Sequence, residues 1–154
     1  MKSKIQSSYT DNNCFFCGSD NNDGLKLSFY WDSIKKEAHT EYVPAHHFVG
    51  QGNILHGGIQ TGLLDEIIGW TSYIVSEKMA VTTNLNTSFL QPLYISKEKI
   101  QVKSAQQPPE HFIYYPHRNI TISFVANSNI RSSRHYSPII FTKTRFFLRP
   151  SNSP

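Results

Sequence analysis

The stretch Asn53–Trp70, "NILHGGIQTGLLDEIIGW", determines the fold class. Leucine and isoleucine recur in it at helical spacing and predict a helix that runs from about Gly57 to Glu77. Glycine recurs as well, although each interior glycine costs a helix about 1 kcal/mol relative to alanine. On a helical wheel, one side of this helix carries almost no side chains, and we call it the glycine seam: Gly58, Gly62, Asp65 and Gly69.

The opposite side of the helix is apolar and predicts what the helix buries. Its residues are Leu63, Ile67, Trp70 and Ile74, flanked by Leu64, Ile68 and Val75. A seam without side chains lets another backbone or a ligand approach closely. The spacing alone is compatible with tight packing against a partner, with Asp65 at the edge, or with an active site around Asp65. We expect a second subunit to cover the seam, because one small sheet cannot bury both sides of the helix.

The rest of the chain shows alternating patterns typical of β-strands. The candidate strands are residues 25–31, 37–43, 81–92, 99–106, 119–127 and 138–150, and the candidate long loops are 106–118 and 127–137. A single helix cannot supply repeated parallel crossovers, so we expect antiparallel pairing. The pattern predicts an α+β domain over residues 23–150, with five or six strands around one long helix. Residues 1–22 are polar, which favours a loose start, and residues 151–154 form a tail.

Composition limits the class of protein. The chain has 154 residues, of which 38% are hydrophobic and 17% charged, which is enough for one packed core and excludes general disorder. No apolar run reaches the roughly 18 residues of a membrane helix, and the start lacks the apolar stretch of a signal peptide. We therefore expect a cytoplasmic protein. The net charge of +4 comes from scattered residues, and with no helix-turn-helix segment visible we predict no nucleic-acid partner.

The start of the predicted helix has features of a catalytic site. The first amides of a helix have no intrahelical acceptor and attract negative charge. Gly57 and Gly58 follow His56 there, so a carbonyl oxygen could reach their N–H groups, as an oxyanion hole requires. Asp65 lies about two and a half turns further along the same helix. It could hold a water molecule or attack an electrophile directly.

Two other features have competing interpretations. Cys14-x-x-Cys17 suggests zinc or redox chemistry, but a tetrahedral zinc site needs four ligands and no second CxxC or HxxxH is present. We therefore predict a structural role for the two cysteines and no metal. Glu66 could replace Asp65 as a base, but it points some 100° away round the helix. For Glu66 the sequence favours a solvated or interface ion pair.

Three segments together resemble a known family. "HGGIQTGLLDE" (residues 56–66) resembles the signature of hotdog-fold acyl-CoA thioesterases of the phenylacetyl-CoA-thioesterase type. "CFFCGSDNNDGLKLSF" (14–29) is similar to the opening of a subgroup of these proteins, and "TNLNTSFLQPLY" (83–94) is similar to the strand after their central helix. The resemblance implies an antiparallel sheet wrapped around a long helix. It also implies a homodimer, or a homotetramer built from two dimers, with active sites between subunits.

The resemblance implies that the protein hydrolyses an acyl-CoA thioester to a carboxylate and CoA. It implies that Asp65 is the catalytic acid, that Gly58 or Gly57 polarises the thioester carbonyl, and that His56 shapes the helix start. Thr82 matches a Ser or Thr that touches the water or the acid. No cofactor is implied, because CoA is part of the substrate, and the CoA contacts stay unknown. The alternative is a non-catalytic acyl-CoA or acyl-lipid sensor on the same fold, which would not need Asp65 in the seam.

Overall fold

The computed structural model describes residues 1–6, 12–77, 81–85, 87, 89, 91–105, 111–115, 120–124, 129–131 and 139–140. The elements in chain order are β1 (Lys2–Lys4), β2 (Tyr30–Asp32), β3 (Glu37–Tyr42), the 3-10 helix η1 (His46–Phe48), α1 (Gly57–Ser76), β4 (Val81–Asn84), β5 (Ile100–Ala105), β6 (His111–Tyr115), β7 (Ile120–Phe124), β8 (Asn129–Arg131) and β9 (Ile139–Ile140). Every strand pair among them is antiparallel. The predicted α+β class with one long helix is confirmed.

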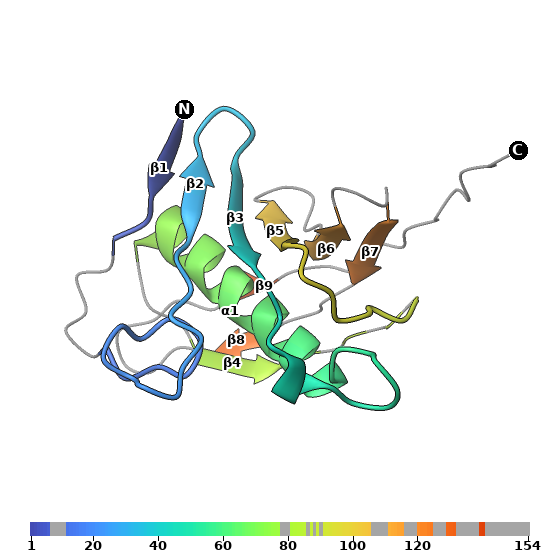
Figure 1. Cartoon of the computed structure of the whole chain (residues 1–154). Coiled ribbons are helices and arrows are strands. Elements are labelled where there is room, and N and C mark those ends of the chain that lie inside the picture. Colours follow the sequence, from blue (N-terminus) through green and yellow to red (C-terminus); the bar gives the residue numbers. More distant parts are fainter. Residues whose placement is uncertain are drawn as a thin grey trace, which may run out of the picture.

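The strands form two sheets with α1 between them. The larger sheet has six strands in the order β1-β2-β3-β5-β6-β7, and the smaller has three in the order β4-β8-β9. The larger sheet wraps the helix, and β4 runs along the other side of it (Figure 1). The predicted five or six strands were counted over the whole chain, whereas the described residues contain nine, and the second sheet was not predicted.

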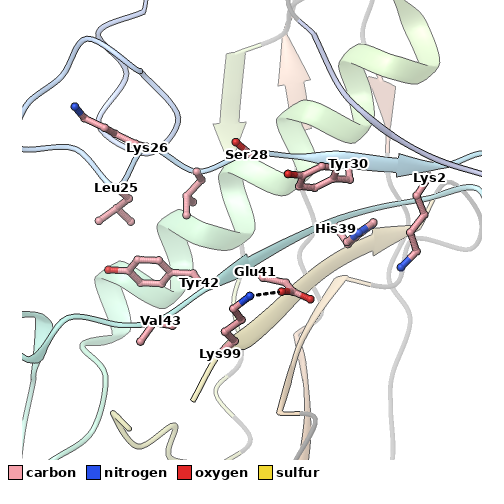
Figure 2. Close-up of a pocket in the computed structure, with 11 residues that line it drawn as sticks. Lys2, Leu25, Lys26, Ser28, Tyr30, His39, Glu41, Tyr42, Val43 and Lys99 are labelled. Atoms are coloured by element: carbon pink, nitrogen blue, oxygen red, sulfur yellow. Dashed lines mark hydrogen bonds and ion pairs between the residues drawn. The ribbon is translucent and has the colours of Figure 1, made fainter. Parts of the chain in front are cut away.

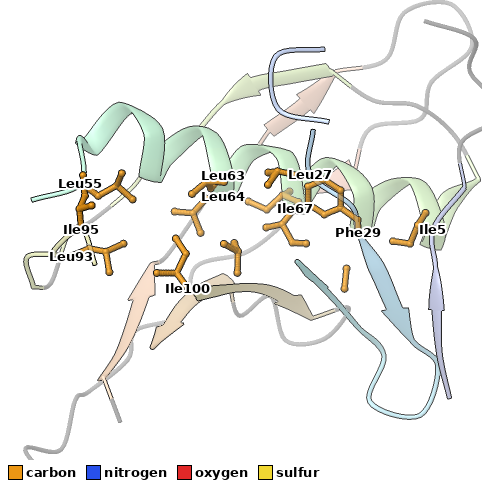
Figure 3. Close-up of a cluster of buried hydrophobic side chains, with 13 residues drawn as sticks. Ile5, Leu27, Phe29, Leu55, Leu63, Leu64, Ile67, Leu93, Ile95 and Ile100 are labelled. Atoms are coloured by element: carbon orange, nitrogen blue, oxygen red, sulfur yellow. The ribbon is translucent and has the colours of Figure 1, made fainter. Parts of the chain in front are cut away.

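The core fills the space between α1 and the larger sheet (Figure 3). From the helix it takes Leu63, Leu64, Ile67 and Ile68, and from the rest of the chain mainly Leu27, Phe29, Ala38, Leu55, Leu93, Ile100 and Val102. Full burial of each leucine or isoleucine contributes roughly 1.5–3 kcal/mol, so these contacts fix the helix against the sheet.

The buried face of α1 is rotated from the predicted stripe. Val75 is 45% exposed and Trp70 and Ile74 are only half-buried, whereas Thr71 and Ser72 are buried. The Thr71 hydroxyl can be buried because it donates to the Ile67 carbonyl of the same helix, at 2.8 Å. Small residues on this side let the sheet approach the last turns of the helix closely.

The helix start is held by two other segments. The Leu55 N–H donates to the Leu93 carbonyl at 2.7 Å, and the His56 N–H donates to the Phe48 carbonyl at 2.9 Å. These bonds fix the backbone on both sides of the point where α1 begins, at Gly57. Within the described residues, no helix is long and apolar enough to cross a bilayer.

Several strands differ from the prediction. β1 lies where a loose start was predicted, and β6 and β8 lie within the predicted loops 106–118 and 127–137. These strands are three to five residues long and pair through backbone groups, so they leave too little periodicity to detect. The predicted strand 25–31 is shortened to Tyr30–Asp32. Lys26 has a left-handed φ of 51° that interrupts extended backbone, and the Leu25 and Leu27 N–H groups donate to the carbonyls of Phe15 and Phe16. Most of the last predicted strand lies outside the described residues.

Candidate active site

Asp65 lies in the middle of α1 and contacts β4. The Thr82 hydroxyl on β4 donates a short hydrogen bond to Asp65 Oδ1, at 2.6 Å. Both side chains are half-buried. Among the residues that the structure describes, Asp65 Oδ2 has no partner, so it can accept a bond from a water molecule. The structure thus brings together two residues of the predicted site that are 17 positions apart in the chain.

His56 occupies the N-cap of α1. Its Nδ1 accepts the Gly58 N–H at 3.0 Å, so the imidazole caps the start of the helix. His56 therefore shapes the helix start, as the resemblance implies. The same bond gives the Gly58 amide an acceptor, so this amide is not open to a substrate carbonyl while His56 holds it.

The Gly57 amide differs from the Gly58 amide in its hydrogen bonding. Within the described part of the chain it has no acceptor, which is the usual state of the first amide of a helix. The Phe89 ring lies beside it, and a Cβ at Gly57 would be 3.3 Å from Phe89 Cζ. Phe89 is 50% exposed, so the rim next to this amide is partly apolar. Of the two glycines that the sequence offers as oxyanion donors, the geometry favours Gly57.

Part of the glycine seam is covered by the chain itself. A Cβ at Gly62 would overlap the Phe16 ring, with Cε2 at 2.8 Å. Cover of the seam by a second subunit stays a prediction, and at Gly62 Phe16 of the same chain already lies on the seam. The reason is that the segment carrying the two cysteines folds back onto the helix. At Gly69 no described atom lies within 4 Å of an added Cβ, so this part of the seam is open.

Cys14 and Cys17 lie against Glu66. The Cys14 thiol donates to Glu66 Oε2 at 3.7 Å, and the Trp70 Nε1–H donates to Glu66 Oε1 at 3.0 Å. Burial raises the pKa of the Cys17 thiol, and the neighbouring Glu66 and Cys14 raise it further. Within the described residues Glu66 forms hydrogen bonds with a thiol and an indole instead of the predicted ion pair. Sequence reasoning missed this cluster because Glu66 is 52 positions from Cys14.

A pocket of about 680 Å³ lies elsewhere on the molecule (Figure 2). It is lined by side chains from the chain start, residues 25–30, β3 and Lys99. Burial lowers the pKa of His39 in this pocket, and Lys2 and Lys103 lower it further, so the imidazole is neutral at pH 7. Lys99 is paired with Glu41 at 3.1 Å. None of the predicted site residues lines this pocket.

No protein-family model matches the sequence, and no curated protein matches it significantly. Solved structures do match. A thioesterase superfamily protein has a TM-score of 0.64 at 14% identity, over 78% of this chain and 61% of that one. Thioesterase superfamily member 2 from Mus musculus has a TM-score of 0.56 at 14% identity, over 69% and 83%. The PaaI protein of E. coli, from the phenylacetic acid degradation operon, has 0.50 at 14% identity, over 58% and 68%.

These similarities establish the fold. The chain has the hotdog fold of thioesterase superfamily proteins, as the three sequence segments predict. It spans less than two thirds of the length of the first of these structures. At this level of identity, the activity has to be argued from the residues of this chain.

Proposed function

We propose that this chain hydrolyses acyl-CoA thioesters. The observation that supports this most strongly is the hydrogen bond from Thr82 to Asp65, which holds one carboxylate oxygen and leaves the other available. Asp65 lies on the same rigid helix as the Gly57 amide. A fixed base and an oxyanion donor are the two groups that acyl transfer to water needs. Within one chain they lie eight residues apart on α1, about 12 Å along its axis, so we propose that Asp65 of one subunit acts with the Gly57 amide of the other.

The proposed reaction begins with the thioester carbonyl accepting a hydrogen bond from the Gly57 N–H. Asp65 then either removes a proton from an attacking water or attacks the carbonyl itself to form a mixed anhydride. Negative charge develops on the carbonyl oxygen, where one backbone donor contributes about 3 kcal/mol to the transition state. The carbon–sulfur bond breaks, and CoA leaves as the thiolate. In the general-base route the thiolate takes up the proton that Asp65 removed from water. In the anhydride route a water molecule then hydrolyses the anhydride, which releases the carboxylate and regenerates Asp65. Gly58 would add a second donor if the His56 ring turned away.

We further propose that the active protein is a homodimer or a dimer of dimers and that it works in the cytoplasm. The open stretch of the seam at Gly69 supports the first part, since a second subunit could still pack there. CoA itself is part of the substrate, and we propose no separate cofactor.

The direct test is a panel of acyl-CoAs that covers short, long and aromatic acyl groups, with thiol release measured at micromolar enzyme. We expect release from at least one member of the panel, and the preferred member defines the acyl group. Tight binding of an acyl-CoA without any thiol release would instead support the sensor alternative.

Thr82 is proposed as a positioning residue for Asp65. Thr82→Val keeps the side-chain shape but removes the hydroxyl, so Asp65 loses its fixed orientation. We expect kcat to fall about tenfold with little change in KM, corresponding to about 1.4 kcal/mol for a bond to a charged group. Thr82→Ser retains the donor and should keep kcat within about twofold. Steady-state kinetics on the three proteins measures this, and equal kcat in Thr82→Val and wild type would contradict the role.

A further inference from the structure

The loop that carries the two cysteines packs on α1 and is held in its conformation by backbone hydrogen bonds. We call residues 12–24 the cysteine loop. The Gly18 N–H donates to the Cys14 carbonyl at 2.8 Å, and the Leu25 N–H donates to the Phe15 carbonyl at 2.8 Å. A Cβ at Gly18 would meet the Cys14 carbonyl oxygen at 2.6 Å, so the tight turn after the second cysteine requires glycine. The turn places both thiols on the same side of the loop.

Phe16 determines the position at which the cysteine loop packs on α1. Its ring occupies the space that the missing side chain of Gly62 leaves. Glu66 lies one turn further along α1 on the same side, because residues at i and i+4 are neighbours on a helix. The cysteines on either side of Phe16 therefore face the Glu66 carboxylate.

Three potential metal ligands meet at this contact. Cys14 Sγ, Cys17 Sγ and a carboxylate oxygen of Glu66 all lie within 4.8 Å of one another. In a tetrahedral zinc site, sulfur at about 2.3 Å and oxygen at about 2.0–2.2 Å from the metal are separated by about 3.5–3.7 Å. The Cys14 Sγ to Glu66 Oε2 distance is 3.7 Å. The pair is therefore already at the separation that a shared zinc ion imposes.

The carboxylate is held in a suitable orientation. The Trp70 Nε1–H donates to Glu66 Oε1 at 3.0 Å, which leaves Oε2 directed at the thiols. Trp70 is itself fixed by stacking on Phe29, with ring centroids 5.5 Å apart. Metal-binding carboxylates are commonly oriented by such a hydrogen bond from a residue that does not touch the metal.

We propose that Cys14, Cys17 and Glu66 bind one Zn²⁺, with a water molecule as the fourth ligand. Both thiols release their protons to solvent on binding, and the resulting three negative ligands surround a dication. Thiolate ligands select zinc over the oxygen-preferring Mg²⁺ and Ca²⁺. The ion would fasten the cysteine loop to α1 beside Asp65. A disulfide between the two cysteines is the competing outcome, and it would leave the nearby carboxylate without a role.

Metal content tests the proposal on the full chain, purified under reducing conditions. After equilibration with zinc, wild type should hold about one zinc per chain. Cys14→Ser combined with Cys17→Ser should hold none, and Glu66→Gln should bind zinc at least about 10–100-fold more weakly. Glu41→Gln is the matched control, since Glu41 also accepts two side-chain hydrogen bonds, from Lys99 and Gln101, but lies away from the loop. Its zinc content should equal that of wild type.

Cobalt(II) identifies the ligands without any measurement of activity. The sequence contains only two cysteines, so a sulfur-to-cobalt charge-transfer band can come only from this site. We expect the band in wild type and its loss in the double cysteine variant. Zinc at 100-fold excess over its Kd should raise the Tm of metal-free wild type by about 5–10 °C. If the double variant fails to fold by circular dichroism, the comparison of wild type with Glu66→Gln decides the question.

Three results would overturn the proposal. The first is wild type with reduced thiols that binds no zinc. The second is zinc retained undiminished by a folded double cysteine variant, or by Glu66→Gln. The third is wild type whose thiols join in a disulfide while zinc is present. None of these results bears on thioester hydrolysis, which is measured separately.

Discussion

Replacing Asp65 with asparagine is expected to lower kcat on the best acyl-CoA by about 10²–10⁴-fold, the usual cost of losing a general base. Asparagine keeps the shape of the side chain, and its carbonyl oxygen can still accept the Thr82 hydroxyl. It lacks the negative charge that removes a proton from water or attacks the thioester. Thermal stability should change little, because Asp65 is only half-buried and is not a member of the hydrophobic core. Single-turnover kinetics and a melting curve measure both effects.

Glu77→Gln is the matched control for Asp65→Asn. Glu77 is an exposed carboxylate at the end of the same helix, so this change removes the same charge without touching the proposed site. Its kcat should equal that of wild type. Turnover near the wild-type level in Asp65→Asn would end the proposed role of Asp65. Loss of turnover in both variants would point to a general charge effect instead.

Gly62→Ala and Gly69→Ala are expected to change stability in opposite directions. Alanine is favoured over glycine inside a helix by about 1 kcal/mol, and at Gly69 an added Cβ meets no described atom within 4 Å. In the single chain, Gly69→Ala should therefore stabilise the fold by about 1 kcal/mol, whereas a loss of stability would show that a second subunit packs on the seam there. At Gly62 the same methyl overlaps the Phe16 ring. Overpacking of this kind costs about 1–3 kcal/mol and outweighs the gain in helix propensity.

The Phe16 ring packs against the hydrophobic core, and the Leu27 N–H fixes the Phe16 backbone by donating to its carbonyl at 2.9 Å, so the ring can move only by giving up core contacts. We expect the two variants to differ by about 2–3 kcal/mol, or roughly 5–10 °C in Tm for a chain of this size. Chemical denaturation with two spectroscopic probes gives the free energies of unfolding. Equal stabilisation by both alanines would show that the cysteine loop does not rest on Gly62 in solution.

The helix and the long strands could be predicted because their signals are local. α1 begins at Gly57, as its glycines and apolar spacing indicate, and β3, β5 and β7 lie within predicted strands. β6 was missed because two prolines precede it and its aromatic residues follow no clean alternation. The rotation of the buried face depends on how closely the sheet approaches Thr71 and Ser72. No residue of the helix alone encodes that distance.

The residues of the candidate site could be predicted from the sequence, but their hydrogen-bond partners could be predicted only in part. Asp65 and Thr82 were expected near each other, and they are hydrogen-bonded. The bond between His56 and Gly58 was not expected, because a histidine N-cap competes with a substrate for the same amide. For Glu66, the contact with Trp70 follows helical i, i+4 spacing, but the contact with the cysteines depends on the tertiary fold of a distant loop.

Lys2 and Lys4 lie on β1, an outer strand of the six-stranded sheet, and both are exposed. The free side of such a strand carries unpaired N–H and C=O groups that can recruit a strand from another molecule. A three-residue strand with two lysines is a poor template, because the run is short and the charges on two copies repel each other. Two copies of this chain are therefore not expected to pair their β1 strands into a continuous sheet, and aggregation through this sheet edge is disfavoured.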